Sequence, residues 1–144
     1  MITVEMDFDL GKINLDLHKE LNIIGRMVRE DHTKRLQRGV DVNGNQMTAL
    51  ADATIERKGF NQILWDTGQM GNLVIDKADK TNQTVVIHPG AKRKRGKVTS
   101  QDIGGFHQRG DGVPKREWFG ITKDVEAKAI KMIELRMERE IRRA

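Results

Sequence analysis

Several residue types on which other protein classes depend are missing or scarce in this chain of 144 residues. It has no cysteine, which excludes a disulfide scaffold and a thiolate metal site. It has no tyrosine, and its one serine, Ser100, lies beside a basic stretch with no evident base. No run approaches the length of a transmembrane helix, and the first residues do not resemble a signal peptide, so we expect cytoplasmic synthesis.

The usual catalytic patterns are missing as well. The four histidines are scattered, and they form neither an H-E-x-x-H motif nor a His/Asp metal-binding spacing. Gly104-Gly105 lacks the Lys-Ser/Thr pair of a phosphate-binding loop. We therefore expect no enzyme: no catalytic residues, no metal and no cofactor. A small hydrolase would require the histidines and carboxylates to converge in a cleft, and the sequence does not indicate one.

Residues 39–46, GVDVNGNQ, have turn chemistry throughout. The D-x-N-x-N pattern that begins at Asp41 matches the first half of a calcium-binding loop. Such a loop has glycine at its sixth position and a bidentate glutamate at its twelfth, where this chain has Gln46 and Asp52. The sequence therefore predicts a turn here rather than a calcium site.

The net charge of +5 comes from one short stretch. Five cations lie within six residues: Lys92, Arg93, Lys94, Arg95 and Lys97. Without them the remainder of the chain has no net charge. This pattern favours a local contact by one basic loop over a broad DNA-binding face.

Alternation of apolar and polar residues predicts the strands. Residues 2–10 alternate almost perfectly, which is typical of a half-buried strand with an acidic solvent face. Residues 73–78 and 83–88 flank a turn-rich tetrapeptide and predict a hairpin, in which we read His88 as a structural residue. Residues 63–68, with Trp65 among them, predict a buried plug that a turn follows.

Apolar residues at three- and four-residue steps predict helices over residues 14–37 and 122–143, with a short one over 51–57. Gly39 is a typical residue just past a helix end, and Thr122 is a typical N-cap. A glycine inside the first helix, Gly25, indicates close packing against a neighbour. We read two histidines of this helix as surface or boundary residues: His18 and His32.

Residues 89–106 contain the basic stretch and little apolar content, which predicts a long mobile loop. The sequence shows no internal repeat and no domain linker, so we expect a single domain over residues 1–144. Its predicted fold is α+β, with a long N-terminal helix and a C-terminal helix packed on a small antiparallel sheet.

The segment at residues 107–120, HQRGDGVPKREWFG, organises the rest of the chain. Its first part permits a tight exposed turn, and Pro114 then favours an extended arm over residues 113–120. Arg116 offers a fork of donors for a carboxylate, and we expect it to be exposed and to fix register between subunits. Trp118 either anchors the last helix in its own subunit or fills a pocket on the next one.

The order and spacing of these motifs resemble the virion morphogenesis, or tail completion, proteins of tailed bacteriophages. The resemblance covers about residues 10–140 and rests on joint spacing rather than on any one motif. The motifs are Gly39-x-Asp41-x-x-Gly44, Leu50, Thr54 and Lys58, Ile63-Leu64, Thr67-Gly68-x-Met70, His107-Gln108-x-Gly110 and Val113-Pro114-x-Arg116-x-Trp118-Phe119-Gly120. Two departures are Met47, where the family has tryptophan, and the lack of Tyr-Ala before His107.

The resemblance implies a structural virion protein of the phage neck that completes or terminates the tail and helps join it to the head. It implies a ring, of six subunits, with tail tube or sheath proteins and head connector proteins as partners, and non-specific contact with packaged DNA as a further interaction. It also implies that the protein assembles in the host cytoplasm and has no membrane among its partners. The expected subunit or partner contacts are Arg109, Lys115, Arg116, Trp118 and Phe119. The alternative is a small basic nucleic-acid-binding module that uses the loop at residues 92–97.

Overall fold

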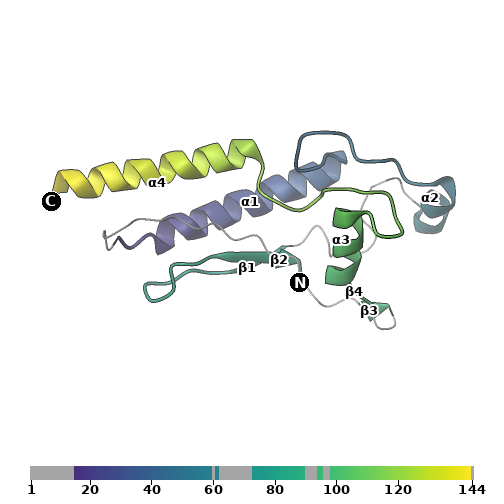
Figure 1. Cartoon of the computed structure of the whole chain (residues 1–144), viewed down its shortest axis with the longest axis horizontal. Helices are drawn as coiled ribbons and strands as arrows, with labels where there is room; N and C mark the ends of the chain where they lie inside the picture. The colour runs from purple at the N-terminus through teal and green to yellow at the C-terminus, as the bar shows by residue number, and fades with distance from the viewer. Residues whose placement is uncertain (1–14, 60, 62–72, 90–93, 96–97, 144) are drawn as a thin grey trace.

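The computed structural model describes residues 15–59, 61, 73–89, 94–95 and 98–143, and has an α+β fold (Figure 1). Two long helices run along the molecule, and a β-hairpin lies beside the first of them. The elements in chain order are α1 (His18–Arg38), α2 (Asp52–Lys58), β1 (Leu73–Asp76), β2 (Val86–Pro89), β3 (Lys94–Arg95), β4 (Val98–Thr99), α3 (Ser100–Arg109) and α4 (Lys123–Arg143). The predicted fold class is confirmed.

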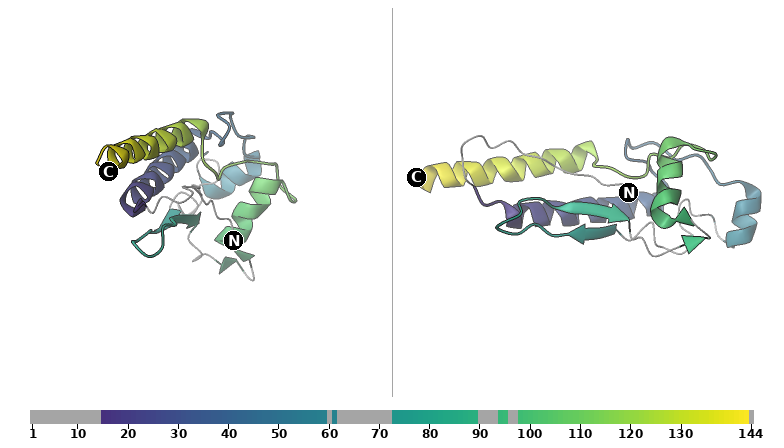
Figure 2. Two further views of the ribbon diagram at one scale, coloured as in Figure 1. Left: turned by 60° about the vertical axis from the view of Figure 1, so that its left-hand side comes forward. Right: turned by 60° about the horizontal axis from the view of Figure 1, so that its bottom comes forward.

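Helices α1 and α4 lie side by side and run in opposite directions (Figures 1 and 2). An ion pair joins them near the start of α1, where Arg136 Nη1 lies 2.7 Å from Glu20 Oε1. Both predicted caps are present. Gly39 has the left-handed φ of 66° that ends α1, and the Thr122 hydroxyl accepts the backbone N–H of Val125.

Strands β1 and β2 form the predicted antiparallel hairpin, with Ile75 opposite Ile87. The hairpin is fixed to α1 by the Asn22 side chain, which donates to the Ala78 carbonyl and accepts from the Ala78 N–H at 2.9 and 2.8 Å. At Gly25 a Cβ atom would lie 3.0 Å from a methyl group of Val85. The close packing predicted for Gly25 is therefore confirmed.

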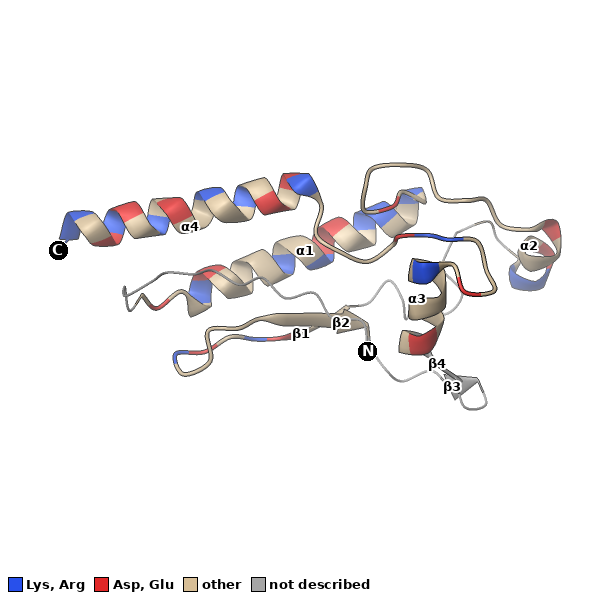
Figure 3. Ribbon diagram, viewed as in Figure 1, with Lys and Arg blue, Asp and Glu red and all other residues tan. Residues whose placement is uncertain are grey.

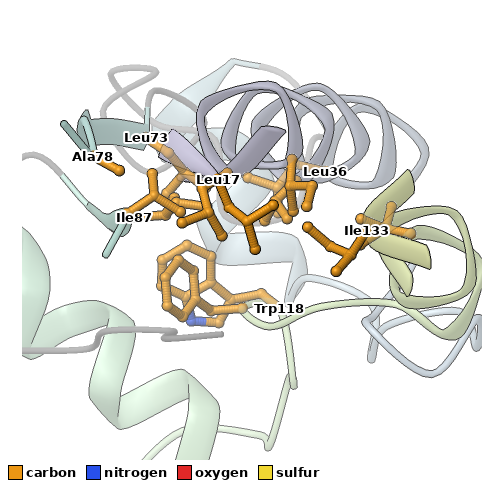
Figure 4. Close-up of a cluster of buried hydrophobic side chains, with 14 of the residues drawn as sticks. Leu17, Leu36, Leu73, Ala78, Ile87, Trp118 and Ile133 are labelled. Carbon is orange, nitrogen blue, oxygen red and sulfur yellow. The ribbon is translucent and has the colours of Figure 1, made fainter. Parts of the chain in front are cut away.

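The core lies between these layers (Figure 4). Helix α1 contributes Leu21, Ile24, Val28 and Leu36, α4 contributes Val125, Ala129 and Ile133, and the hairpin closes the other side. Trp118 lies at one end of this core and has no exposed surface. Met47, at the position where the resembled family has tryptophan, is buried in the same cluster.

The predicted loop over residues 89–106 is wrong for its second half, where residues 100–109 form α3. Ahead of it, β3 and β4 pair as a second small antiparallel sheet. The pair Gly104-Gly105 and the scarcity of apolar residues conceal this helix from sequence patterns. Its stabilising contacts come from elsewhere in the chain: the Trp118 indole donates to the Gly104 carbonyl at 2.8 Å.

Some predicted features lie outside the described residues: the strand at residues 2–10, the plug with Trp65, and Lys92, Arg93 and Lys97 of the basic loop. The backbone of the other two loop cations, Lys94 and Arg95, forms β3. Within the described ranges, no helix combines the length and the apolar character that crossing a membrane requires.

Candidate subunit-contact site

The arm at residues 113–120 brings together the motifs that the sequence singled out. Its aromatic end is internal: Trp118 is fully buried and Phe119 is 4% exposed. The two rings pack on each other with their centroids 5.3 Å apart. Of the two roles considered for Trp118, the structure shows the first, in which it anchors the chain in its own subunit. Neither ring is exposed for a contact with another protein.

Helix α1 supplies two buried polar side chains to this anchor. The His32 ring lies 5.3 Å from the Trp118 ring, and only 1% of the residue is exposed. Arg35 is 4% exposed, and it donates to Asp31 Oδ2 and to the Trp118 carbonyl at 2.8 and 3.1 Å. The prediction that His32 is a surface or boundary residue is therefore wrong. Its imidazole completes an aromatic cluster that neither the arm nor α1 forms alone.

Arg116 is also buried, with 5% of its surface exposed, which overturns its predicted exposure. Among the described residues, its guanidinium has no carboxylate partner. Nε and Nη2 donate to the carbonyls of Thr48 and Ala49 at 2.9 and 3.2 Å, and Nη1 donates to His107 Nδ1 at 3.2 Å. The Arg116 side chain thus connects the arm to residues 48–49, which follow the turn 39–46, and to α3. Because these are charge-assisted bonds in a buried site, Arg116 contributes to folding.

His107 lies on the α3 side of this contact. Its backbone carbonyl accepts the Arg116 N–H at 2.7 Å, and its Nδ1 accepts from the Arg116 guanidinium. Since a guanidinium only donates, the ring proton is on Nε2 and the imidazole is neutral. Burial, and then the nearby positive charge of Arg116, lower the pKa of His107 to about 4, against a smaller opposing effect of a hydrogen bond with the Pro114 backbone.

The turn at residues 39–46 contacts the other side of the arm. The Val42 N–H donates to the Glu117 carbonyl, and the Asn43 amide donates to Glu117 Oε2, both at 2.8 Å. At Gly120, where φ is 154°, a Cβ atom would lie 3.1 Å from a Val42 methyl group. The tightness of this approach explains why glycine follows the two aromatic residues.

Asp41 shapes the turn itself. Its Oδ1 accepts the backbone N–H groups of Asn43 and Asn45, both at 2.9 Å, as in an Asx turn. The carboxylate therefore organises backbone donors, as the turn prediction requires. Among the described residues, no group of three or more histidine or acidic side chains lies close enough to hold a metal ion.

The arm's remaining predicted contact residues lie on the surface. Arg109 pairs with Asp111 at 2.7 Å, and Lys115 pairs with Glu117 at 2.9 Å. The cationic side chain is 60% exposed in each pair. The salt bridge to Lys115, and then the Asn43 hydrogen bond, lower the pKa of Glu117. Of the five residues predicted to contact a partner, Arg109 and Lys115 are therefore the two that a partner can reach.

Comparison of the chain with protein-family models, with curated proteins and with solved structures found no match.

Proposed function

We propose that this protein is a structural subunit of a tailed-bacteriophage neck, which completes the tail and helps join it to the head as a member of a ring of six. The proposal rests on the resemblance of its ordered motifs to the tail completion family. In this role the protein contributes surfaces rather than a reaction. Its partners are further copies of itself, tail tube or sheath proteins and head connector proteins.

One observation carries the proposal: motifs far apart in the sequence meet in a single cluster. The turn 39–46 bonds to Glu117, the segment that follows it bonds to Arg116, and His107-Gln108 bonds to Arg116 and Phe119. Three of the motifs on which the resemblance rests therefore contact one another in this chain, while Ile63-Leu64 and Thr67-Gly68-x-Met70 lie outside the described residues.

The division between buried and exposed residues supports a role in assembly. We call the buried contacts around Arg116, Trp118 and Phe119 the arm cluster; it also includes His32 and Arg35 of α1 and His107 of α3. The arm cluster holds α1 and α3 against the arm, while Arg109 and Lys115 lie on the outside. A ring closes only when each subunit holds its two contact surfaces at a fixed rotation, which a rigid interior favours. Each subunit also needs charged, exposed groups that set register with its neighbours.

The alternative, a nucleic-acid-binding module, depends on the five cations at residues 92–97. Three of those residues lie outside the described part of the chain, so the structure adds no contact geometry to this reading. A test therefore has to separate the two functions directly. The steep salt dependence of phosphate binding provides one readout, and assembled mass provides the other.

The experiment measures the mass of the purified chain with phage tails assembled without it, and its affinity for duplex DNA over a range of salt concentrations. The test variant replaces all five loop cations with glutamine; the control variant carries Lys77→Gln and Lys80→Gln, on the exposed hairpin turn. Stoichiometric addition of both variants to tails, with weak DNA binding, supports the proposal. Tight DNA binding that only the loop variant loses, without addition to tails, would establish the alternative.

A further inference from the structure

Charges of both signs alternate along α4 (Figure 3), and one side of the helix faces away from the core. We call it the outer face of α4. Its residues are spaced alternately by four and three positions, which places them on one side of a helix. They are Asp124, Lys128, Lys131, Leu135, Glu138 and Arg142, and all of them are exposed.

The middle of the outer face is apolar. Leu135 is 46% exposed, and it lines a shallow depression with Met132 and Ala127, at whose rim lie the stems of Lys128 and Lys131. Leu135, Met132 and Ala127 together form an apolar depression that a second apolar surface can cover.

The charge order of this face is complementary to itself when one copy is reversed. If a second α4 lies antiparallel with Lys131 opposite Leu135, then Lys128 lies opposite Glu138 and Asp124 lies opposite Arg142. The two-fold axis repeats each pair, which gives four opposite-charge pairs around two leucines. In a parallel arrangement each charge would meet its own copy, and every pair would be repulsive.

We propose that the outer face of α4 is a docking surface for a second copy of this chain, which pairs antiparallel about a two-fold axis. Helix α4 has 21 residues, so the contact is one helix long and the affinity is low. The pair therefore forms reversibly as concentration rises. Opposite charges set its direction and register, and Leu135 and Met132 supply the buried area.

Two groups of the face already interact within one subunit. Lys128 Nζ lies 2.9 Å from Asp124 Oδ2, while the two side chains stay 63% and 73% exposed. An exposed i,i+4 pair is weak, so both groups can also bind a partner. The inference does not rest on the proposed function. A two-fold contact between two copies differs from the head-to-tail contact between neighbours in a ring. The dimer and the ring can therefore be tested separately, and either can fail while the other stands.

The test is sedimentation equilibrium of the full chain with charge-swap variants. Lys128→Glu alone, or Glu138→Lys alone, makes two of the four pairs repulsive, and each should weaken dimerisation by about tenfold. The double variant Lys128→Glu/Glu138→Lys restores opposite charges and should recover wild-type association. Lys123→Glu is the matched control: it makes the same charge change on another side of α4, and should leave dimerisation unchanged.

Direction is tested by cross-linking, since the chain has no cysteine of its own. A mixture of Asp124→Cys and Arg142→Cys chains should form a mixed disulfide faster than either chain alone. Circular dichroism confirms that each variant is folded. Self-linking of Asp124→Cys as the dominant product, a double swap that stays monomeric, or a wild-type chain that is monomeric at every concentration would each overturn the proposal. The last result, together with loss of tail binding in Leu135→Ala, would assign the face to another protein.

Discussion

The arm cluster and the outer face of α4 use the same residue types in opposite ways. In the arm cluster, Arg35 and Arg116 are buried, and their guanidinium groups donate to backbone carbonyls at fixed distances. On the outer face, the charged side chains are exposed and the 2.9 Å pair of Lys128 with Asp124 is local. The difference lies in solvent: a cation that has lost its water must be hydrogen-bonded, whereas an exposed one can exchange partners.

This comparison implies that the two regions respond differently to substitution. Changes in the arm cluster should alter the free energy of unfolding, because they leave a cavity or an unpaired buried group. Changes on the outer face should alter association and leave folding intact.

The largest effect is expected for Trp118→Ala. The substitution removes a fully buried indole that packs on His32 and Phe119 and donates to the Gly104 carbonyl. It should lower the free energy of unfolding by about 3–5 kcal/mol, which chemical denaturation measures. Trp118→Phe keeps part of the ring volume and should cost less. A variant that unfolds like the wild type would show that the arm is not the anchor of the fold.

Arg116→Ala should cost about 2–4 kcal/mol, since it removes three charge-assisted or polar hydrogen bonds and the packing of a side chain that is only 5% exposed. The matched control is its neighbour Lys115→Ala, which removes an exposed pair and should change stability by less than about 1 kcal/mol. Denaturation of both variants side by side provides the measurement. Equal losses in the two variants would contradict the structural difference between these adjacent cations.

His107 gives the arm cluster a pH dependence. Its pKa is about 4 in the folded chain, below the usual 6.5, so the unfolded chain takes up a proton first as pH falls. The stabilisation is fully present above pH 6.5 and decreases between pH 6.5 and 4. For this half-buried ring we expect a loss of about 1–2 kcal/mol.

The measurement is the difference in unfolding free energy between the wild type and His107→Gln across that pH range. Taking the difference cancels the contributions of the carboxylates and of the other three histidines. The wild type should lose more stability than the variant as the solution is acidified. A constant difference would mean that His107 has the same pKa in both states.

The smallest effect is expected for Lys128→Ala, measured at a concentration where the chain is monomeric. The side chain is 63% exposed, so the change in unfolding free energy should stay within about 0.5 kcal/mol. A larger loss would show that the outer face contributes to the stability of the monomer. The two regions would then not differ in their effect on the free energy of unfolding.

Local patterns were sufficient to predict much of this fold. The ends of α1 and α4 follow from periodicity and from the signals at Gly39 and Thr122, and the hairpin follows from alternation around a turn. These features depend on residues close together in sequence. They therefore leave a signature that can be read without the structure.

The rest depends on contacts between distant residues. Helix α3 contains two adjacent glycines, which local patterns do not favour in a helix. The arm holds it in place: the Trp118 indole donates to the Gly104 carbonyl, and the Phe119 N–H donates to the Gln108 side chain. The burial of His32, Arg35 and Arg116 is equally hidden, because polar residue types are mostly exposed and only their partners identify the exceptions. The same contacts separate the buried Arg116, Trp118 and Phe119 from the exposed Arg109 and Lys115, and no local pattern marks that difference.

The most direct test of the proposed function is a reconstruction of phage particles that are assembled in the presence of this chain. We expect a ring of six copies at the junction of head and tail, in which each arm stays inside its own subunit, and Arg109 and Lys115 face neighbouring proteins. Particles in which the chain is absent, or is present as isolated copies without lateral contacts, would contradict the proposed function. A ring in which Trp118 enters a neighbouring subunit would contradict the assignment of the arm to the interior.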